Sequence, residues 1–284
     1  MTPAAKHVRD LIAFYLDAGV DSAVGEEPVN YFADRPEPTA SPPATKRAQP
    51  LFRDAPSSPT TPPKGTGNGT ADVPRAPTPV PVVSPDAAVM AAREAARNAQ
   101  NLDELRALLD SFEGCMLRAT ATQLVFASGT PGARVMFVGE APGRDEDIAG
   151  EPFVGRSGKL LDLMLQAIGL DRTKAYIANV VPWRPPGNRT PTPHETAICL
   201  PFIRRQIELA NPDILVCLGQ PSTQTLLGTR EGITRTRGRW FKFDTGTREI
   251  RALPTFHPAF LLRSPLQKRF VWRDLLALKR ALAA

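Results

Sequence analysis

Apolar, strand-like runs alternate with amphipathic helical stretches over most of the second part of this chain. Strands separated by helices are joined by crossovers, which build a mostly parallel sheet with helices on both faces. The pattern therefore predicts a three-layer α/β/α fold around a central, mostly parallel four-stranded sheet. The strand-like runs are 135–138, 176–181, 214–218 and 250–256; 240–243 is a candidate hairpin strand; helices are expected at 86–97, 102–109, 158–168, 193–210, 221–227 and 268–282.

The first 86 residues differ in composition from the rest of the 284-residue chain and hold 16 of its 30 prolines. A stretch rich in Pro, Ala and Thr buries too little apolar surface to offset its ordering entropy. We therefore expect a short helical segment at 1–30, a disordered linker at 31–86 and a folded domain at 87–284. An apolar helical face within 4–18 suits either docking to an unknown protein partner or packing on its own domain; it holds Val8, Leu11, Ile12, Tyr15 and Leu16.

Charge is also unevenly distributed. Residues 1–86 carry 8 Lys and Arg against 10 Asp and Glu, whereas 87–284 carry 27 against 19. A basic domain suits a polyanion such as nucleic acid. No apolar run is long enough to span a bilayer, and a secretory signal is not expected. Three scattered cysteines are too few for a disulfide scaffold, so we expect a cytoplasmic location. We also expect a monomer.

Unusual residues follow each strand-like run. Ligands of parallel sheets bind beyond the carboxyl ends of the strands, so these four segments are expected to meet at one site. They are 139–143, Asn179, Gly219-Gln220 and His257-Pro258.

The first of these segments opens a glycine-rich, acidic loop that lacks the spacing and the Lys-Ser/Thr end of a phosphate-binding loop. Its carboxylates, Glu140 and Glu146 among them, are candidates for positioning water or a small base; the alternative is a solvated acidic turn. Phe153 follows in a loop between proline and glycine, where its ring either stacks on a base or closes the core.

Asn179 places an amide at the end of an apolar strand. Its N–H₂ can donate to a carbonyl while its C=O accepts from an imide N–H, which matches the O4 and N3–H edge of uracil. Cytosine presents the reverse pattern and would leave buried groups unpaired. The alternative is an amide that serves a neighbouring loop.

His257 follows the fourth strand-like run, where a neutral imidazole can donate to an oxyanion forming on a leaving base; the alternative is a structural donor. The next residues combine apolar and basic side chains. Leu261 and Leu262 are candidate wedges for the gap left by an extruded base, or else core residues. Candidates for phosphate contacts are Arg263, Lys268 and Arg269.

These segments together resemble the uracil-DNA glycosylase superfamily, and within it the family-four type. The likeness covers about 110–282 and none of 1–100. The matching motifs are Gly-Glu-Ala-Pro-Gly at 139–143, Gly-Glu-Pro-Phe-Val-Gly at 150–155, Asn179 ahead of Arg-Pro-Pro-Gly-Asn-Arg at 184–189, and Phe-His-Pro-Ala-Phe-Leu-Leu at 256–262.

The resemblance implies roles in binding and releasing the base. Phe153 would stack on a flipped uracil, with Ala141 also at the base, and Asn179 would recognise the O4/N3 edge. His257 would stabilise charge on O2 as the base leaves. Glu146 resembles the position that crowds C5 and so excludes thymine.

The resemblance leaves the residue that positions water open. Related families use an Asp in the first motif, where this chain has Ala141. Glu140, Glu146 and Asp147 remain candidates. The resemblance also implies DNA contacts by Arg184 and by the loop 258–265, which would enter the base stack.

One departure concerns a cofactor. Family-four enzymes usually hold a four-iron, four-sulfur cluster with four cysteines. The matching positions here carry Phe112, Cys115, Trp183 and Cys199. Two thiolates cannot replace four, so we expect no cluster, no other metal, and apolar packing by Phe112 and Trp183 in its place.

The function implied is that of a monofunctional DNA-repair glycosylase that flips uracil from DNA and hydrolyses its N-glycosidic bond, leaving an abasic site. No lysine in these motifs is placed for strand cleavage through a Schiff base. Two alternatives stay open: a glycosylase of the same fold acting mainly on hypoxanthine or xanthine, and a non-catalytic protein that binds abasic or uracil-bearing DNA.

Overall fold

The structure is a computed structural model that describes residues 85–283. The predictions for the helical segment at 1–30 and for nearly all of the linker at 31–86 lie outside the described residues.

The described part is built on a six-stranded sheet in the order β1-β3-β2-β4-β6-β5. Its four central strands are parallel, as the sequence predicts, and an antiparallel strand lies at each edge. The edge strand β5 is the predicted hairpin partner of the fourth run; β1 has only two residues and was not predicted. The strands are β1 (Ser128–Gly129), β2 (Val135–Gly139), β3 (Tyr176–Asn179), β4 (Ile214–Leu218), β5 (Phe241–Asp244) and β6 (Glu249–Thr255).

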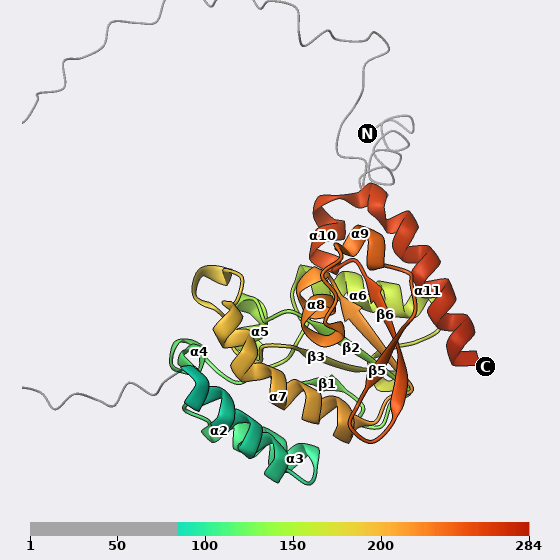
Figure 1. Cartoon of the computed structure of the whole chain (residues 1–284). Coiled ribbons are helices and arrows are strands. Elements are labelled where there is room, and N and C mark those ends of the chain that lie inside the picture. Colours follow the sequence, from blue (N-terminus) through green and yellow to red (C-terminus); the bar gives the residue numbers. More distant parts are fainter. Residues whose placement is uncertain (1–84, 284) are drawn as a thin grey trace, which may run out of the picture. The chain divides into compact units, whose positions relative to one another are not determined.

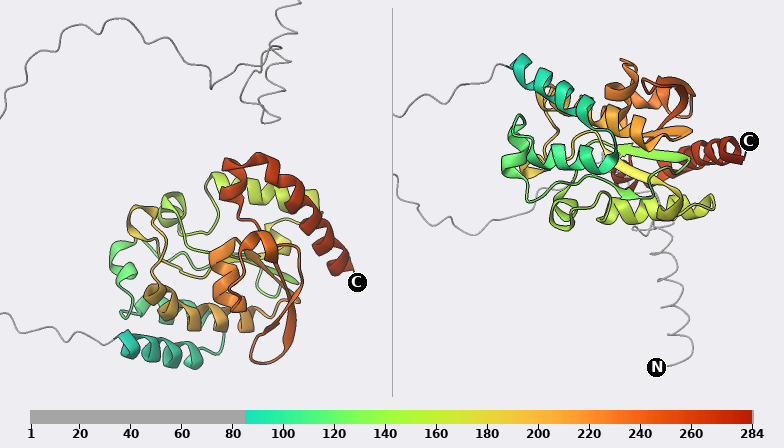
Figure 2. Two further views of the ribbon diagram at one scale, coloured as in Figure 1. Left: turned by 45° about the horizontal axis from the view of Figure 1, so that its top comes forward. Right: turned by 90° about the horizontal axis from the view of Figure 1, so that it is seen from below.

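Helices cover both faces of the sheet (Figure 1). On one side lie α2 (Pro85–Asn98), α3 (Leu102–Ser111), α7 (Pro193–Ala210) and α8 (Gln220–Leu227), and on the other α6 (Arg156–Ala167) and α11 (Lys268–Ala283). The left view of Figure 2 shows α2 running alongside α7. Shorter elements are α4 (Met116–Thr120), α5 (Arg144–Ala149), α9 (Ile233–Thr236), α10 (Pro258–Arg263), η1 (Arg172–Lys174), η2 (Pro186–Asn188) and η3 (Pro265–Gln267).

Alternation along the strands explains the two cores. Every residue of β2, β3 and β4 is buried, as expected for interior strands of a parallel sheet. Successive side chains point to opposite faces. Met136 and Val138 thus join the core under α7, while Val135 and Phe137 join the core under α6 and α11.

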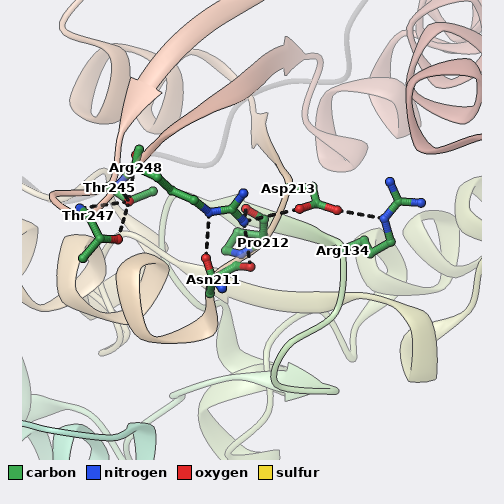
Figure 3. Close-up of polar contacts among 7 residues, drawn as sticks. All are labelled: Arg134, Asn211, Pro212, Asp213, Thr245, Thr247 and Arg248. Carbon is green, nitrogen blue, oxygen red and sulfur yellow. Dashed lines mark hydrogen bonds and ion pairs between the residues drawn. The ribbon is translucent and has the colours of Figure 1, made fainter. Parts of the chain in front are cut away.

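Polar side chains tie the opposite, amino-terminal edge of the sheet together (Figure 3). Arg248 donates to the Oδ1 of Asn211 at 2.8 Å and to the carbonyl of Pro212 at 2.9 Å. Asp213 accepts from both Arg248 and Arg134. These side chains are partly exposed, so each ion pair alone contributes little to the stability of the fold. The candidate functional groups lie at the other edge of the sheet.

Candidate active site

The loops at the carboxyl edge of the sheet enclose a cavity of about 750 Å³. It is lined by residues that follow β2, β3, β4 and β6, so the four segments do meet at one site. Phe153, Asn179 and His257 all line this cavity, although 104 residues separate the first from the last.

Phe153 is fixed in a demanding backbone conformation. Its φ of 57° lies in the left-handed region, and its side chain is 4% exposed. Arg172 donates to the carbonyl of Phe153 and, at 3.1 Å, to that of Pro152, while Gly158 allows a close backbone approach that a Cβ would block. Such strain persists only where neighbouring groups enforce it, and here it presents the ring to the cavity.

Asn179 ends β3 and is 5% exposed. Its Oδ1 has no hydrogen-bond partner, although native buried polar groups are almost always paired. Gly139 on the neighbouring β2 makes room for this group, because a Cβ there would overlap Oδ1 and lie 2.7 Å from Cζ of Phe153. The amide and the ring therefore lie together across a position where only glycine fits.

His257 caps the start of α10. Its Nδ1 accepts the backbone N–H of Ala259 at 3.1 Å, so the proton of a neutral ring is on Nε2. Burial, together with the charge of Arg263, lowers the pKa of His257 to about 4. The imidazole is therefore neutral at pH 7. The rings of His257 and Phe153 lie 5.5 Å apart and are tilted by 30°.

The three acidic candidates differ in what they already bind. Glu146 accepts the backbone N–H groups of Gly143 at 3.0 Å and Gly155 at 3.1 Å, which ties the two motif loops together. Asp147 accepts the backbone N–H and the hydroxyl of Thr122 at 2.8 and 2.9 Å. Both carboxylates thus shape the loops.

Glu140 is the candidate with a free group. Its Oε1 is buried without a partner, and burial raises the pKa of its carboxyl. Glu140, Ala141 and Glu146 all line the cavity, whereas Asp147 is absent from its lining. This arrangement separates one carboxylate with an unpaired oxygen from two that hold the loops by hydrogen bonds.

Comparison with known proteins identifies the family of this chain. A family model described as the uracil DNA glycosylase superfamily matches residues 126–276. The chain belongs to this superfamily. It is 40% identical over 170 residues to a type-4 uracil-DNA glycosylase of Archaeoglobus fulgidus, covering 58% of this chain and 85% of that protein. The type-4 uracil-DNA glycosylase of Thermotoga maritima is 45% identical over 151 residues, which cover 53% of this chain and 77% of that protein. The type-4 uracil-DNA glycosylase of Sulfurisphaera tokodaii is 39% identical over 179 residues, which cover 61% of this chain and 81% of that protein.

The predicted DNA-contacting residues all lie within the matched range, and the prediction for one of them is wrong. Leu261 is 1% exposed and belongs to the core under α6 and α11, so it does not reach DNA. It faces inward because α10 packs on α6. Its neighbour Leu262 is 37% exposed, and Arg263 lines the cavity.

The remaining basic candidates lie away from the cavity. Lys268 and Arg269 line a second, apolar groove between α6 and α11. Arg184 donates to the Oδ1 of Asn188 at 2.7 Å and lies 3.8 Å from Asp147, so its guanidinium is engaged within the protein. In the same loop, Arg189 lines the cavity instead.

Sequence reasoning missed an exposed leucine that follows the segment 258–265. Leu266 is 83% exposed in η3, the most exposed large apolar side chain in the described part of the chain. The segment 258–265, predicted as a loop, consists mostly of the helix α10, and Leu266 directly follows it, close in sequence to Lys268 and Arg269. An apolar side chain between Pro265 and Gln267, in an otherwise polar turn, is the signal that would have identified it.

The cluster of the family-four type does not fit the residues present. Of the four matching positions only Cys115 and Cys199 are thiols, and within the described residues no group of three or more His, Cys, Asp or Glu is placed to hold a metal ion. Between residues 85 and 283 no helix has the length and apolar character needed to cross a membrane.

Proposed function

We propose that this protein is a DNA glycosylase that excises uracil from DNA and leaves an abasic site. The observation that carries the proposal is the unpartnered Oδ1 of Asn179, buried in one cavity with the ring of Phe153 and the neutral imidazole of His257. The type-4 uracil-DNA glycosylases to which the chain is similar support this assignment.

Base selection follows from the amide of Asn179. The imide N3–H of uracil donates to Oδ1, and the amide N–H₂ donates to O4. Cytosine has an acceptor at N3 and an amino group at C4, so it would leave both ends of the amide unpaired. A buried polar group without a partner costs about 1–3 kcal/mol. Phe153 adds sequence-independent stacking worth about 1–3 kcal/mol per base.

His257 stabilises the departing base. When the N-glycosidic bond breaks, its electron pair stays with the base, and negative charge develops at O2. The Nε2–H of His257 donates to this oxygen, while Nδ1 stays bound to the backbone of Ala259. A neutral donor in a dry site needs no proton transfer to stabilise the anion.

Glu140 acts on the sugar side. Its free carboxylate oxygen holds the attacking water and offsets positive charge on the sugar ring. Water attacks C1′, its oxygen forms the new bond, and its proton passes to solvent or to Glu140. Glu146, held by two backbone N–H groups, forms the wall at C5 and excludes the methyl group of thymine.

The rest of the site supports the same reaction. No lysine is among the residues that line the described cavity, so cleavage of the strand through a Schiff base is not part of the proposal. Leu262, Leu266 and Arg263 follow His257 and would fill the gap in the duplex and hold phosphates. We expect a monomeric, cytoplasmic enzyme; the predicted protein partner of the segment 1–30 lies outside the described residues.

The test is incubation with a labelled oligonucleotide containing one uracil, followed by alkali, which cleaves at abasic sites. Wild type is expected to give a cleaved product, and Asn179→Asp, which replaces the donor end of the amide, to lose about 100-fold or more. Asn98→Asp is the matched control, because Asn98 is exposed at the end of α2.

Two other outcomes would refute the proposal. Faster release of hypoxanthine or xanthine than of uracil would assign another deaminated base. Tight binding of the oligonucleotide with no base released, and no difference between wild type and His257→Ala, would assign a non-catalytic binding protein.

A further inference from the structure

Four side chains stand where the family-four type has the cysteine ligands of an iron–sulfur cluster, namely Phe112, Cys115, Trp183 and Cys199. A phenyl ring has no donor atom, and an indole has only an N–H that donates. The set therefore supplies two thiols where the cluster needs four. No carboxylate or imidazole joins these thiols to make a third ligand in the part of the chain that the structure describes.

We propose that this protein folds without a cluster, and that Phe112 and Trp183 replace it with an apolar plug. The plug consists of Phe112, Cys115, Trp183, Cys199 and Phe202, all packed in the core under α7. It joins the end of α3, the start of α4 and the loop after β3 to helix α7, which a cluster would otherwise link through sulfur.

The ring of Phe112 occupies a space that the chain leaves for it. Phe112 ends α3, and its ring meets that of Phe202 on α7 edge to face, with centroids 5.0 Å apart and planes at 70°. A Cβ on Gly114 would lie 2.8 Å from Cε1 of Phe112, so the ring folds back over a residue that has no side chain. Such aromatic pairs contribute beyond the area they bury.

The two thiols contact each other. Cys115 is 2% exposed and Cys199 is fully buried. The hydrogen bond between them lowers the pKa of Cys115 and raises that of Cys199. Cys199 and Phe202 are three residues apart on α7 and so lie on one helix face. The thiol pair and the aromatic pair are therefore neighbours.

Trp183 connects the plug to the active site. Its side chain is 2% exposed, among the largest that are fully buried. It directly precedes the loop 184–192, and Pro185, Asn188 and Arg189 of that loop line the cavity. A buried indole removes about 150–250 Å² from water. Trp183 thus anchors the base of this loop by packing, where the family-four type would use a metal bond.

The first experiment measures iron and acid-labile sulfide in the full chain, purified anaerobically from iron-rich cells that overproduce cluster-assembly proteins. We expect neither in stoichiometric amount, no visible absorbance from a cluster, and a melting temperature that a strong iron chelator leaves unchanged. About four iron and four sulfide per chain would overturn the proposal. Because the readout is metal content, its failure would leave the proposed uracil excision intact.

Packing variants test the plug itself. Trp183→Ala is expected to lower the melting temperature by about 10 °C. The matched control Trp272→Ala removes an indole that is 45% exposed, and the expected loss is small. Equal melting temperatures for the two variants would overturn the plug. The double variant Cys115→Ala/Cys199→Ala is expected to stay folded, and its complete unfolding would favour metal ligation instead.

The reverse change tests the position of the plug. Phe112→Cys combined with Trp183→Cys restores four thiols, and we expect this double variant to acquire iron and visible absorbance in the same cells. A soluble double variant without iron would show that the four positions do not converge, and so would overturn the replacement.

Discussion

Gly139 lies at the end of β2 between two groups of the proposed uracil site, and its replacement by alanine tests their geometry. An added Cβ would overlap Oδ1 of Asn179 and lie 2.7 and 3.0 Å from two carbons of the Phe153 ring, where ordinary contact begins at 3.4 Å. The φ of Gly139 is not in the left-handed region, so alanine adds no backbone strain. The effect is steric and local.

Because interiors are close-packed, the amide or the ring must shift by roughly 1 Å. A misplacement of about 1 Å costs about 100-fold in rate, and overpacking costs about 1–3 kcal/mol of stability. We therefore expect Gly139→Ala to remain folded and to excise uracil about 100-fold more slowly under single-turnover conditions.

The assay is single-turnover release of uracil from an oligonucleotide, with urea denaturation to measure the free energy of unfolding. Gly232→Ala is the matched control, because a Cβ at Gly232 would meet its nearest atoms at 3.9 and 4.0 Å. A Gly139→Ala enzyme that excises at the wild-type rate would refute the geometry. A loss of activity fully explained by unfolding would refute it as well.

Four further predictions follow from single groups. The pKa of His257 is about 4 in the folded chain and near 6.5 in the unfolded chain, so between these pH values the unfolded chain binds one proton more. The free energy of unfolding, measured by urea titration, should therefore fall by up to about 1.4 kcal/mol per pH unit from pH 6.5 down to 4. His257→Gln should not show this fall. Glu146→Ala leaves two backbone N–H groups without their acceptor and opens the wall at C5, so the ratio of thymine to uracil release should rise and stability fall by about 1–3 kcal/mol. Leu266→Ala should slow excision from duplex more than from single-stranded DNA, without changing the melting temperature, because the side chain is 83% exposed. Asp274→Ala leaves Arg237 without its buried partner and removes the 2.7 Å bond from Thr255, so urea denaturation should show a loss of about 3–5 kcal/mol; an unchanged value would refute the role of this pair.

The positions of the strands, and the edge of the sheet that holds the candidate site, could both be predicted from the pattern of apolar residues. The strand residues are apolar on both faces, which distinguishes interior parallel strands, and their ends then share one edge of the sheet. That logic placed Asn179 and His257 together without any knowledge of tertiary contacts. The two-residue strand β1 has no such pattern, since its pairing with β3 is set by the neighbouring chain.

Side-chain direction was harder to predict. Leu261 and Leu262 are adjacent and chemically identical, yet one is buried and the other is partly exposed, because α10 turns one face onto α6. The resemblance implies a DNA contact by Arg184, but in the structure its Nε donates to Asn188 and its guanidinium lies 3.8 Å from Asp147. Likewise, three carboxylates were equivalent candidates in sequence. The donors that bind Glu146 and Asp147 separate these two carboxylates from Glu140, and only the folded structure shows them.

Buried side-chain oxygens that have no hydrogen-bond partner distinguish candidate ligand-binding residues from residues that stabilise the fold. In the described residues there are two, on Glu140 and Asn179, and both belong to the cavity. Each costs folding free energy that paired groups such as Glu146 avoid. Buried polar groups are left without a protein partner mainly at functional sites, where a ligand supplies the missing hydrogen bond. In the proposed reaction, the imide N3–H of uracil would pair with the amide oxygen of Asn179, and the positive charge that develops at C1′ of the sugar would face the carboxylate of Glu140.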